Sequence, residues 1–273
     1  MGGVYRFVSG GTMSWWGKLL GGTFGYILGG PLGAVLGAAL GHSFDKGLRG
    51  LKENGWDLGS QQRVQTAFFT ATFSVMGHLC KADGRVSEDE IIAARAVMSQ
   101  MELSPDLKLT AMRLFNEGKK PDFPLEQALD QFRRECHRRH TLIRLFIEIQ
   151  LQAALSDGRM ADSERTLLLH ICDRLGVSRM EFEQLESMIG AERHFNRGAD
   201  KPASLNDAYA ILGVSPQSRD DEVKKAYRRL LNQHHPDKLV AKGLPEEMMK
   251  LAAQKTHEIK TAYEQIKQVR GIR

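Results

Sequence analysis

The sequence predicts an all-α protein with a single membrane-spanning helix, a helical bundle and a C-terminal helical hairpin. Three observations favour this fold class. One long stretch has no charged residue, apolar residues recur at steps of three and four through the middle of the chain, and two amphipathic segments with matching apolar faces flank a proline. The expected boundaries are 1–18 for an N-terminal periplasmic segment, 19–44 for the transmembrane helix, 45–60 for a juxtamembrane segment, 61–189 for the bundle, 190–204 for a linker and 205–273 for the hairpin module.

The composition limits the class of protein. The chain has 273 residues, of which 42% are hydrophobic and 26% charged, and this excludes a polytopic membrane protein or a largely disordered chain. The net charge of +5 is too small to indicate nucleic acid as the partner. Three widely spaced cysteines without a CxxC pair exclude a disulfide framework and a zinc ribbon. We expect no cofactor.

The segment 19–44 contains no Asp, Glu, Lys or Arg and exceeds the roughly 20 residues that a spanning helix needs. Small residues recur at every fourth position along it, and on a helix they form one smooth ridge where a second helix can approach closely. The ridge predicts a homodimer through Gly21, Gly25, Gly29, Gly33 and Gly37. A cleaved signal peptide and a flexible glycine-rich leader remain as alternatives.

Charged residues around the span predict its orientation. Arg6 and Lys18 precede it, whereas four basic residues follow it within about 20 positions. This excess places the C-terminal domains in the cytoplasm, because loops rich in Lys and Arg stay on that side. Met13 lies just before Trp15 and is a second candidate for the first residue.

Two similar turns, 82–86 and 156–160, divide the middle region into two helical hairpins. Asp-Gly is typical of turns, because Gly accepts a positive φ and Asp bonds the backbone ahead. The alternative is a divalent-metal site built from carboxylates. Its four members would be Asp83, Glu90, Asp157 and Glu164. Ser87 and Glu90 have the spacing of a capping box, so Glu90 can have a structural role without metal. Ala161 stands at the matching position before Glu164 and has no side-chain oxygen for such a box.

The middle region resembles the TerB-like (tellurite-resistance) helical domain, in which turns of this type have been proposed to bind metal. This resemblance supports a second function hypothesis, a metal-binding, membrane-tethered sensor or scaffold. Metal analysis, with melting in the presence and absence of a chelator, discriminates between the hypotheses. A separate cluster of arginines around residues 133–139 indicates a solvated basic face that could attract an acidic partner or lipid headgroups.

The C-terminal module joins a cationic helix to a stiff bend. The helix buries Val223, Ala226 and Leu230 on one side. Its other side carries the stripe Lys224, Lys225, Arg228 and Arg229. Pro236 then fixes its own φ and disfavours helix at the residue before it, so the helix ends and an exposed loop presents His235 and Asp237. A longer helix follows from about residue 244 to residue 269.

Residues 205–270 resemble a DnaJ-type J-domain, since four segments occur in its order and spacing: YAILGV, KKAYRRL, HPDK and EIKTAYEQI. The whole chain resembles the DjlA family of membrane-anchored DnaJ-like proteins of Gram-negative bacteria. The resemblance implies an inner-membrane, single-pass co-chaperone. It also implies that His235, Pro236 and Asp237 trigger ATP hydrolysis by DnaK, and that the cationic stripe binds DnaK's acidic surface. It also implies a link to envelope signalling and capsule polysaccharide induction.

On this interpretation the chain is an interaction protein and not an enzyme, because it changes the rate of a partner. A catalytic or metal site at the histidines is disfavoured, since no nucleophile or Gly-rich phosphate loop accompanies them. A nucleic-acid function for the cationic stripe is disfavoured as well. Its only aromatic residue, Tyr227, belongs to the apolar face and is not free to stack on a base.

Overall fold

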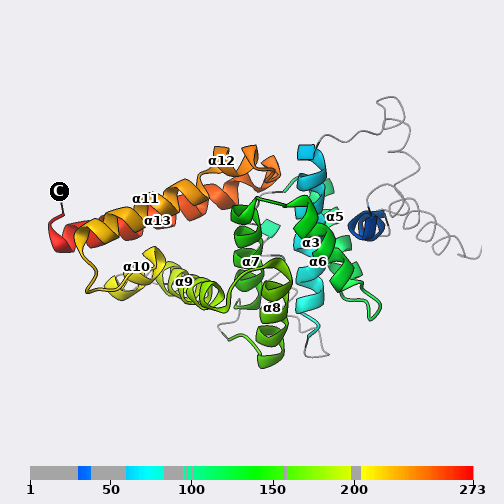
Figure 1. Ribbon diagram of the computed structural model, residues 1–273, viewed down its shortest axis with the longest axis horizontal. Coiled ribbons are helices and arrows are strands. Elements are labelled where there is room, and N and C mark those ends of the chain that lie inside the picture. The colour runs from blue at the N-terminus through cyan, green and yellow to red at the C-terminus, as the bar shows by residue number, and fades with distance from the viewer. Residues whose placement is uncertain are drawn as a thin grey trace, which may run out of the picture.

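The computed structural model describes residues 30–37, 60–82, 95, 98–99, 101, 103–155, 159–197 and 204–272. These residues form helices with short connections (Figure 1). The helices are α3 (Ser60–Leu79), α5 (Pro105–Gly118), α6 (Leu125–Glu135), α7 (His140–Ala154), α8 (Asp162–Leu175), α9 (Arg179–Arg197), α10 (Leu205–Leu212), α11 (Asp220–His234), α12 (Pro236–Ala241), η1 (Glu246–Met248) and α13 (Met249–Arg270). The described part of the chain therefore confirms the all-α prediction.

Helix α3 is the centre of the bundle, with α5, α6, α7 and α8 packed against it. Its large side chains Phe68, Phe73 and Met76 are fully buried. The helix is buried on nearly all sides, so its polar side chains form hydrogen bonds with backbone carbonyls. For example, Thr72 Oγ1 donates to the Phe68 carbonyl at 2.7 Å. From α7, Gln150 Nε2 donates to the Thr72 carbonyl at 3.1 Å, which ties the two buried helices together.

Glycines allow α3 and α5 to cross at backbone contact. A Cβ at Gly118 would lie 1.7 Å from the Ser74 carbonyl oxygen, and a Cβ at Gly77 would lie 1.9 Å from the Phe115 carbonyl oxygen. Neither distance is possible for a real side chain. The crossing therefore requires glycine at both positions.

The start of α8 and the end of α9 differ from the sequence-based expectations. Glu164 Oε2 accepts the Ala161 backbone N–H at 2.9 Å, which completes a capping interaction although Ala161 has no polar side chain. Helix α9 continues to Arg197, so the first part of the expected linker 190–204 is helical. The physical reason is burial: Ala191 and Glu192 pack against the C-terminal module instead of lying in solvent.

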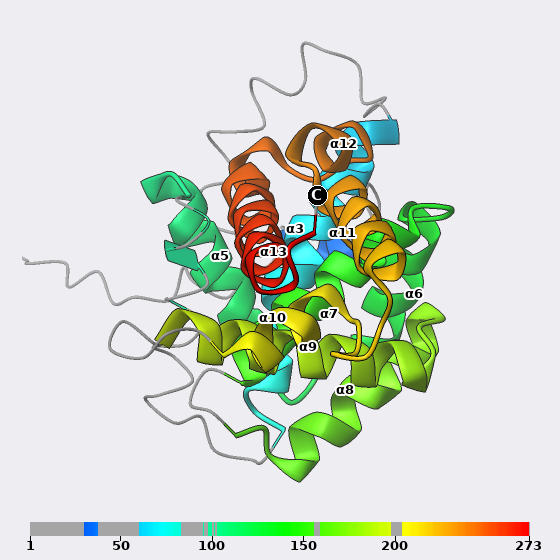
Figure 2. The same cartoon turned by 90° about the vertical axis from the view of Figure 1, so that its left-hand side faces the viewer.

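The C-terminal module has its own core. Helices α11 and α13 run side by side, and α10 closes one end against α9 (Figures 1 and 2). The buried residues that fill the module are Ala208, Tyr209, Ile211, Leu212, Val223, Leu230, Ile259, Ala262, Tyr263, Ile266 and Ile272. Arg270 links the end of α13 to α10 and to the start of α11. Its guanidinium donates to Tyr209 Oη at 2.6 Å, to the Ser218 carbonyl at 2.6 Å and to Asp220 Oδ1 at 3.0 Å.

The other end of the module is packed into the bundle. Apolar side chains from α12, η1 and the start of α13 belong to the bundle core, namely Leu239, Leu244, Met248, Leu251 and Ala252. Gly243 permits this approach, since its φ is +103° and a Cβ there would lie 2.6 Å from Val64 Cγ1 of α3. The hairpin tip and the bundle therefore share one hydrophobic core. Figure 2 shows α12 beside the start of α3.

Residues 30–37, in the middle of the predicted transmembrane helix, form a short helix against α6. Leu32 and Val35 are buried, and the Leu32 N–H donates to Gln131 Oε1 at 2.7 Å. Leu32 and Val35 belong to the same cluster of buried apolar side chains as the bundle core. Among the residues that the structure describes, no helix has both the length and the apolar character to cross a bilayer.

Candidate functional site

The cationic stripe lies on the open face of α11. Lys225, Arg228 and Arg229 are exposed and Lys224 is half-buried, whereas Val223, Ala226 and Leu230 of the opposite face are buried. The helical period produces this division, since the two sets occupy opposite sides of one helix. The apolar face predicted from the sequence is confirmed, and Lys225, Arg228 and Arg229 are exposed on the other face.

Tyr227 belongs to the hairpin interface, as the sequence predicts. Its ring stacks on Tyr263 of α13 with the centroids 3.9 Å apart and the planes 9° from parallel. The pKa of Tyr227 is raised, mainly by burial of the phenol and then by Glu264. The aromatic pair therefore fixes the two long helices to each other, which in turn fixes the direction in which the stripe faces.

His235, Pro236 and Asp237 lie at the turn between α11 and α12. His235 has φ −62° and ψ 122° and precedes Pro236, the first residue of α12. His235 and Asp237 are exposed and Pro236 is half-buried. The expected exposure is confirmed, but the expected loop is a single residue, after which a short helix begins. The reason is that proline disfavours helix before it and favours helix after it.

Hydrogen bonds on both sides hold this turn. The Leu239 N–H donates to the His235 carbonyl at 3.0 Å, and Thr256 Oγ1 of α13 donates to the His234 carbonyl at 3.0 Å. Lys238 Nζ donates to Asn232 Oδ1, which bridges α12 back to α11. His235 and Asp237 are therefore presented on a backbone that is fixed from both helices.

The adjacent His234 points inward and joins a buried charged cluster that the sequence did not reveal. Its Nε2 lies 3.7 Å from Glu148 Oε1 of α7. Lys255 Nζ of α13 donates to Glu192 of α9. Arg144 Nε donates to Glu148 Oε1 at 3.2 Å. The first two contacts join the C-terminal module to the bundle, and the third lies within α7. We call the five residues the interdomain cluster (His234, Lys255, Glu148, Glu192 and Arg144).

Burial controls the ionisation of the interdomain cluster. It raises the pKa of Glu192 to about 7. Burial also lowers the pKa of His234, although Glu148 opposes that shift. For Lys255, burial opposes the charged form, but Glu192, Glu148 and Glu258 outweigh it and raise its pKa. At neutral pH the contact between module and bundle is thus an arrangement of neutral His234, cationic Lys255 and partly ionised Glu192.

The structure describes one of the four carboxylates of the predicted metal site, Glu164. Glu164 is buried and caps α8, so its oxygen already has a structural use. Asp83, Glu90 and Asp157 lie outside the described residues. Within the described part of the chain no group of three or more His, Cys, Asp or Glu side chains could hold a metal ion. The metal site stays a prediction.

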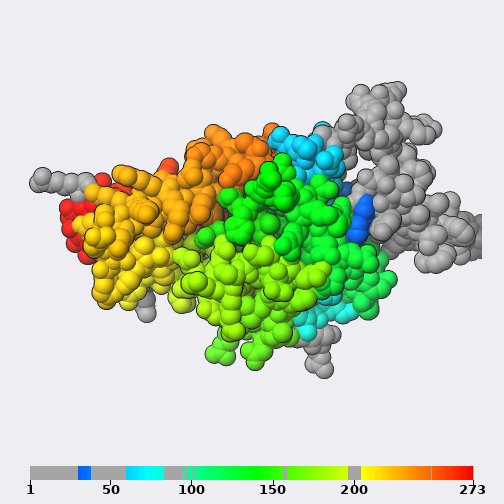
Figure 3. Space-filling view, viewed as in Figure 1, coloured from blue at the N-terminus to red at the C-terminus, as the bar shows by residue number. Residues whose placement is uncertain are grey.

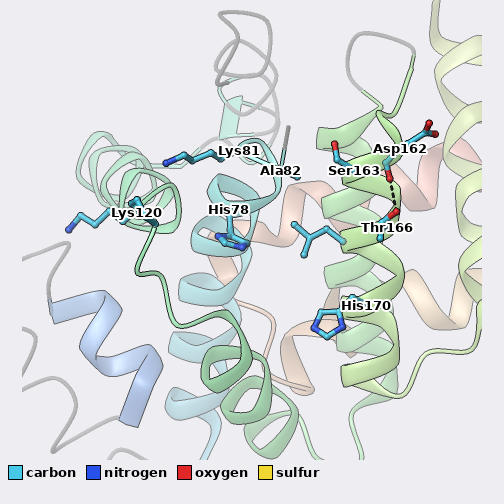
Figure 4. A pocket seen from close by; sticks show the side chains of 10 residues that line it. His78, Lys81, Ala82, Lys120, Asp162, Ser163, Thr166 and His170 are labelled. Carbon is cyan, nitrogen blue, oxygen red and sulfur yellow. Dashed lines mark hydrogen bonds between the residues drawn. The ribbon is translucent and has the colours of Figure 1, made fainter. Parts of the chain in front are cut away.

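A cavity of about 740 Å³ lies at the end of the bundle where α3 ends and α8 begins. His78 and Lys81, at the end of α3, lie on one side of it and Ser163, Thr166 and His170 of α8 on the other, with the Lys81 side chain pointing away from α8 (Figure 4). His78 Nδ1 lies 3.2 Å from the Gly118 carbonyl oxygen, and burial lowers the pKa of this histidine. The cavity is remote from His235, since α12 packs at the opposite end of α3, where Gln61 Nε2 donates to the Val240 carbonyl at 3.4 Å.

The glycine ridge is described only in part. Gly33 and Gly37 lie in the helix of residues 30–37, while Gly21, Gly25 and Gly29 lie outside the described residues. The predicted dimer stays a prediction from the sequence pattern.

Comparison with family models divides the chain into three matches. Residues 13–54 match the Co-chaperone DjlA transmembrane domain, residues 69–187 match Tellurite resistance protein TerB, and residues 207–270 match the DnaJ domain. The matches agree with the succession of anchor, bundle and hairpin module predicted from the sequence. The DnaJ match contains the cationic stripe and the His235 turn. No solved structure matches the chain.

Curated relatives are similar over nearly the whole chain. The Co-chaperone protein DjlA of Coxiella burnetii is 48% identical, covering 95% of this chain and 100% of the relative. The proteins of the same name from Photorhabdus laumondii and Escherichia coli K12 are 45% and 42% identical, each covering 96% of this chain and 100% of the relative. Identity of this extent, together with the J-domain architecture, shows that the chain belongs to the DjlA family of co-chaperones.

Proposed function

We propose that this protein is a membrane-anchored regulatory co-chaperone that binds a DnaK-type chaperone through its J-domain and stimulates ATP hydrolysis by that chaperone. The observation that carries the proposal is the exposed pair His235 and Asp237, held on a fixed turn at the end of a helix with an open cationic face. The chain itself performs no covalent chemistry in this proposal. Through the chaperone it would act on envelope signalling and capsule induction, the link that the family resemblance implies.

The geometry supports a division of roles along α11. Lys225, Arg228 and Arg229 attract an acidic surface and set its orientation, because exposed charges act mainly on encounter and register. Pro236 keeps the turn rigid, so little conformational entropy is lost when a partner binds. His235 and Asp237 then contact the partner with a defined spacing.

The replacement His235→Gln is expected to abolish stimulation while leaving the fold intact, because His235 is exposed and glutamine is similar in size. Single-turnover ATP hydrolysis by a DnaK-type chaperone, measured with the full chain in detergent, tests this. The matched control is His257→Gln, at an exposed histidine of α13, which should stimulate like the wild type. Stimulation by His235→Gln equal to that of the wild type would contradict the proposed function.

We place the protein in the inner membrane as a single-pass protein with its C-terminal domains in the cytoplasm. Three observations support this topology: the transmembrane-domain match at residues 13–54, the charge-free segment 19–44, and the excess of Lys and Arg after that segment. A span of this type keeps the J-domain close to the bilayer surface.

The glycine ridge is the proposed dimer contact within the membrane. Replacing Gly25, Gly29 and Gly33 together by leucine is expected to weaken self-association strongly, since bulky side chains prevent close approach of two helices. A membrane two-hybrid assay measures this. The same three replacements by alanine keep the ridge small and should preserve most of the association. If the leucine variant associates like the wild type, the ridge does not form the dimer.

A further inference from the structure

The turn between α6 and α7 lies beside the end of the J-domain that carries His235. We call residues 134–141 the α6–α7 corner. Lys242, which ends α12, donates to Thr141 Oγ1 in this corner at 2.9 Å. Helix α12 spans six residues, and at 1.5 Å per residue this is about 9 Å. Thr141, at one end of the α6–α7 corner, is therefore separated from His235 by one short helix and the Lys242 side chain.

The α6–α7 corner presents cations whose charge is not neutralised locally. Arg134, His137 and Arg138 are exposed. The neighbouring acids are already engaged, since Glu135 lies 3.5 Å from Arg63 and Glu181 lies 3.4 Å from His140. Within the described part of the chain, no ion pair joins Arg134 or Arg138 to an acidic residue.

Arg138 also has an unusual backbone conformation. Its φ is +62°, and it is the only non-glycine residue with a positive φ in the described part of the chain. Such a conformation is uncommon for arginine and persists only where the surroundings hold it. The Arg139 guanidinium, which donates to the Glu135 carbonyl at 3.1 Å, closes this turn from inside. The turn thus directs the Arg138 side chain to solvent instead of continuing the helix.

The corner is continuous with the surface that the J-domain offers to a chaperone. Figure 3 shows the green atoms of α6 and α7 directly beside the orange atoms of α12, on the same face as α11. A typical protein interface covers about 800 Å² on each partner, a patch roughly 30 Å across. A partner centred on His235 would extend about 15 Å from it and therefore reach the edge of the α6–α7 corner at Thr141.

The interdomain cluster keeps the two surfaces in register. Lys255 is bonded to Glu192, and His234 lies beside Glu148, so the J-domain is fixed to the bundle by buried charges as well as by the shared apolar core. Removing a buried charge from its partner is costly, which disfavours other relative orientations. The bundle is therefore not a passive spacer between the anchor and the J-domain.

We propose that the α6–α7 corner is a second contact surface for the DnaK-type chaperone, on which Arg134 and Arg138 bind acidic side chains of the chaperone while α11 and His235 engage it. This inference rests on the proposed function and adds the helical domain to the docking site. An anionic membrane is the competing partner for exposed arginines. The chaperone is favoured because the corner adjoins the J-domain's own docking face.

The test is a charge reversal at the corner in the full chain in detergent, Arg134→Glu with Arg138→Asp. Aspartate is chosen because it tolerates a positive φ better than most residues do. The concentration of co-chaperone that gives half-maximal ATPase stimulation should rise about tenfold at low salt, with maximal stimulation unchanged. The difference should shrink as salt is raised, because the lost contacts are exposed charges.

The matched control reverses two lysines at the opposite end of the bundle, the exposed Lys108 and the half-buried Lys120, in the double variant Lys108→Glu with Lys120→Glu. The net charge changes by the same amount, so a general loss of positive charge would affect both variants equally. The proposal expects the control to retain the wild-type half-maximal concentration. Equal behaviour of the two double variants would overturn the proposal, whereas failure of the wild type itself to stimulate would instead overturn the proposed function.

A third variant tests whether the α6–α7 corner and the J-domain bind the chaperone as one surface or as two independent surfaces. Lys255→Glu places a fourth acid beside Glu192, Glu148 and Glu258 and should release the J-domain from the bundle. In this background the corner reversal should change the half-maximal concentration less than twofold, and an unchanged tenfold effect would overturn the joint surface. Vesicles of anionic lipid are the last arm. Loss of vesicle binding by the corner variant, with unchanged chaperone stimulation, would assign the corner to the membrane and overturn the proposal.

Discussion

Replacing Gly118 by alanine is expected to lower the free energy of unfolding by about 3–5 kcal/mol. The new Cβ would lie 1.7 Å from the Ser74 carbonyl oxygen, and the contact is with backbone of a buried helix, so no side chain can rotate away. Helices α3 and α5 must then move apart along the whole crossing, which opens space around Phe115 and other buried residues. Thermal unfolding of the full chain in detergent, followed by circular dichroism, should show a midpoint roughly 10 °C below that of the wild type.

Gly190→Ala is the matched control for this prediction. Gly190 lies within α9, and nothing lies within 4 Å of the position that its Cβ would take. Alanine is the better helix former by about 1 kcal/mol, so this variant should be slightly more stable than the wild type. If both glycine variants unfold at the same temperature, the α3–α5 crossing does not require the closeness that the structure shows.

Much of the fold follows from local patterns that the sequence displays openly. The apolar period of α11 and α13 correctly predicts which faces meet, and Gly176, with φ +75°, ends α8 as expected of a glycine at a helix C-terminus. These features depend on residues close together in the chain. Each can be recognised without knowing how the helices are arranged in space.

Two features near helix starts depend on the backbone and not on the side-chain pattern. Glu164 was expected to lack a capping partner, since Ala161 has no polar side chain, yet the Ala161 backbone N–H is a sufficient donor. Proline disfavours helix at the residue before it, and it also favours the first position of a helix, which is why α12 begins at Pro236. In both cases the backbone supplies what the side-chain pattern does not show.

The contact between J-domain and bundle could not be predicted from the sequence. His234, Lys255 and Glu192 each look like solvated polar residues, and Glu192 falls in the segment expected to be a linker. Their burial depends on partners between 63 and 86 positions away: Lys255 pairs with Glu192, and His234 lies beside Glu148. Local periodicity contains no information about such pairs, so the interdomain cluster emerges only from the arrangement of the helices.

Replacing Lys255 by methionine is expected to reduce the free energy of unfolding by about 3–5 kcal/mol at pH 8, because it leaves the carboxylate of Glu192 buried without its cation. Methionine fills a similar volume, so the loss reports on charge and not on packing. The double variant Lys255→Met with Glu192→Met removes both charges and should recover most of the lost stability. Urea unfolding of the full chain in detergent at constant pH measures all three proteins.

The dependence on pH identifies the group responsible. A carboxyl whose folded-state pKa is raised contributes its full stability below its unfolded pKa of 4.5 and loses that contribution as pH rises through the folded value, which for Glu192 is about 7. The wild type should therefore be nearly insensitive between pH 8 and pH 9. Lys255 lowers the pKa of Glu192, so in Lys255→Met the folded value moves higher and stability keeps falling above pH 7, by up to about 1.4 kcal/mol per pH unit.

Other groups of the interdomain cluster do not confuse this measurement. Burial lowers the pKa of His234, so its contribution is complete above 6.5 and is lost only as pH falls, which leaves it neutral in folded and unfolded chains above pH 8. Burial raises the pKa of Glu148, but His234, Lys255 and Arg144 outweigh it and lower that pKa, and Glu148 is present in the single and the double variant alike. A steep loss between pH 8 and pH 9 in Lys255→Met, absent from the double variant, therefore assigns the effect to Glu192. Parallel pH profiles for all three proteins would show that Lys255 and Glu192 do not hold the J-domain to the bundle by charge.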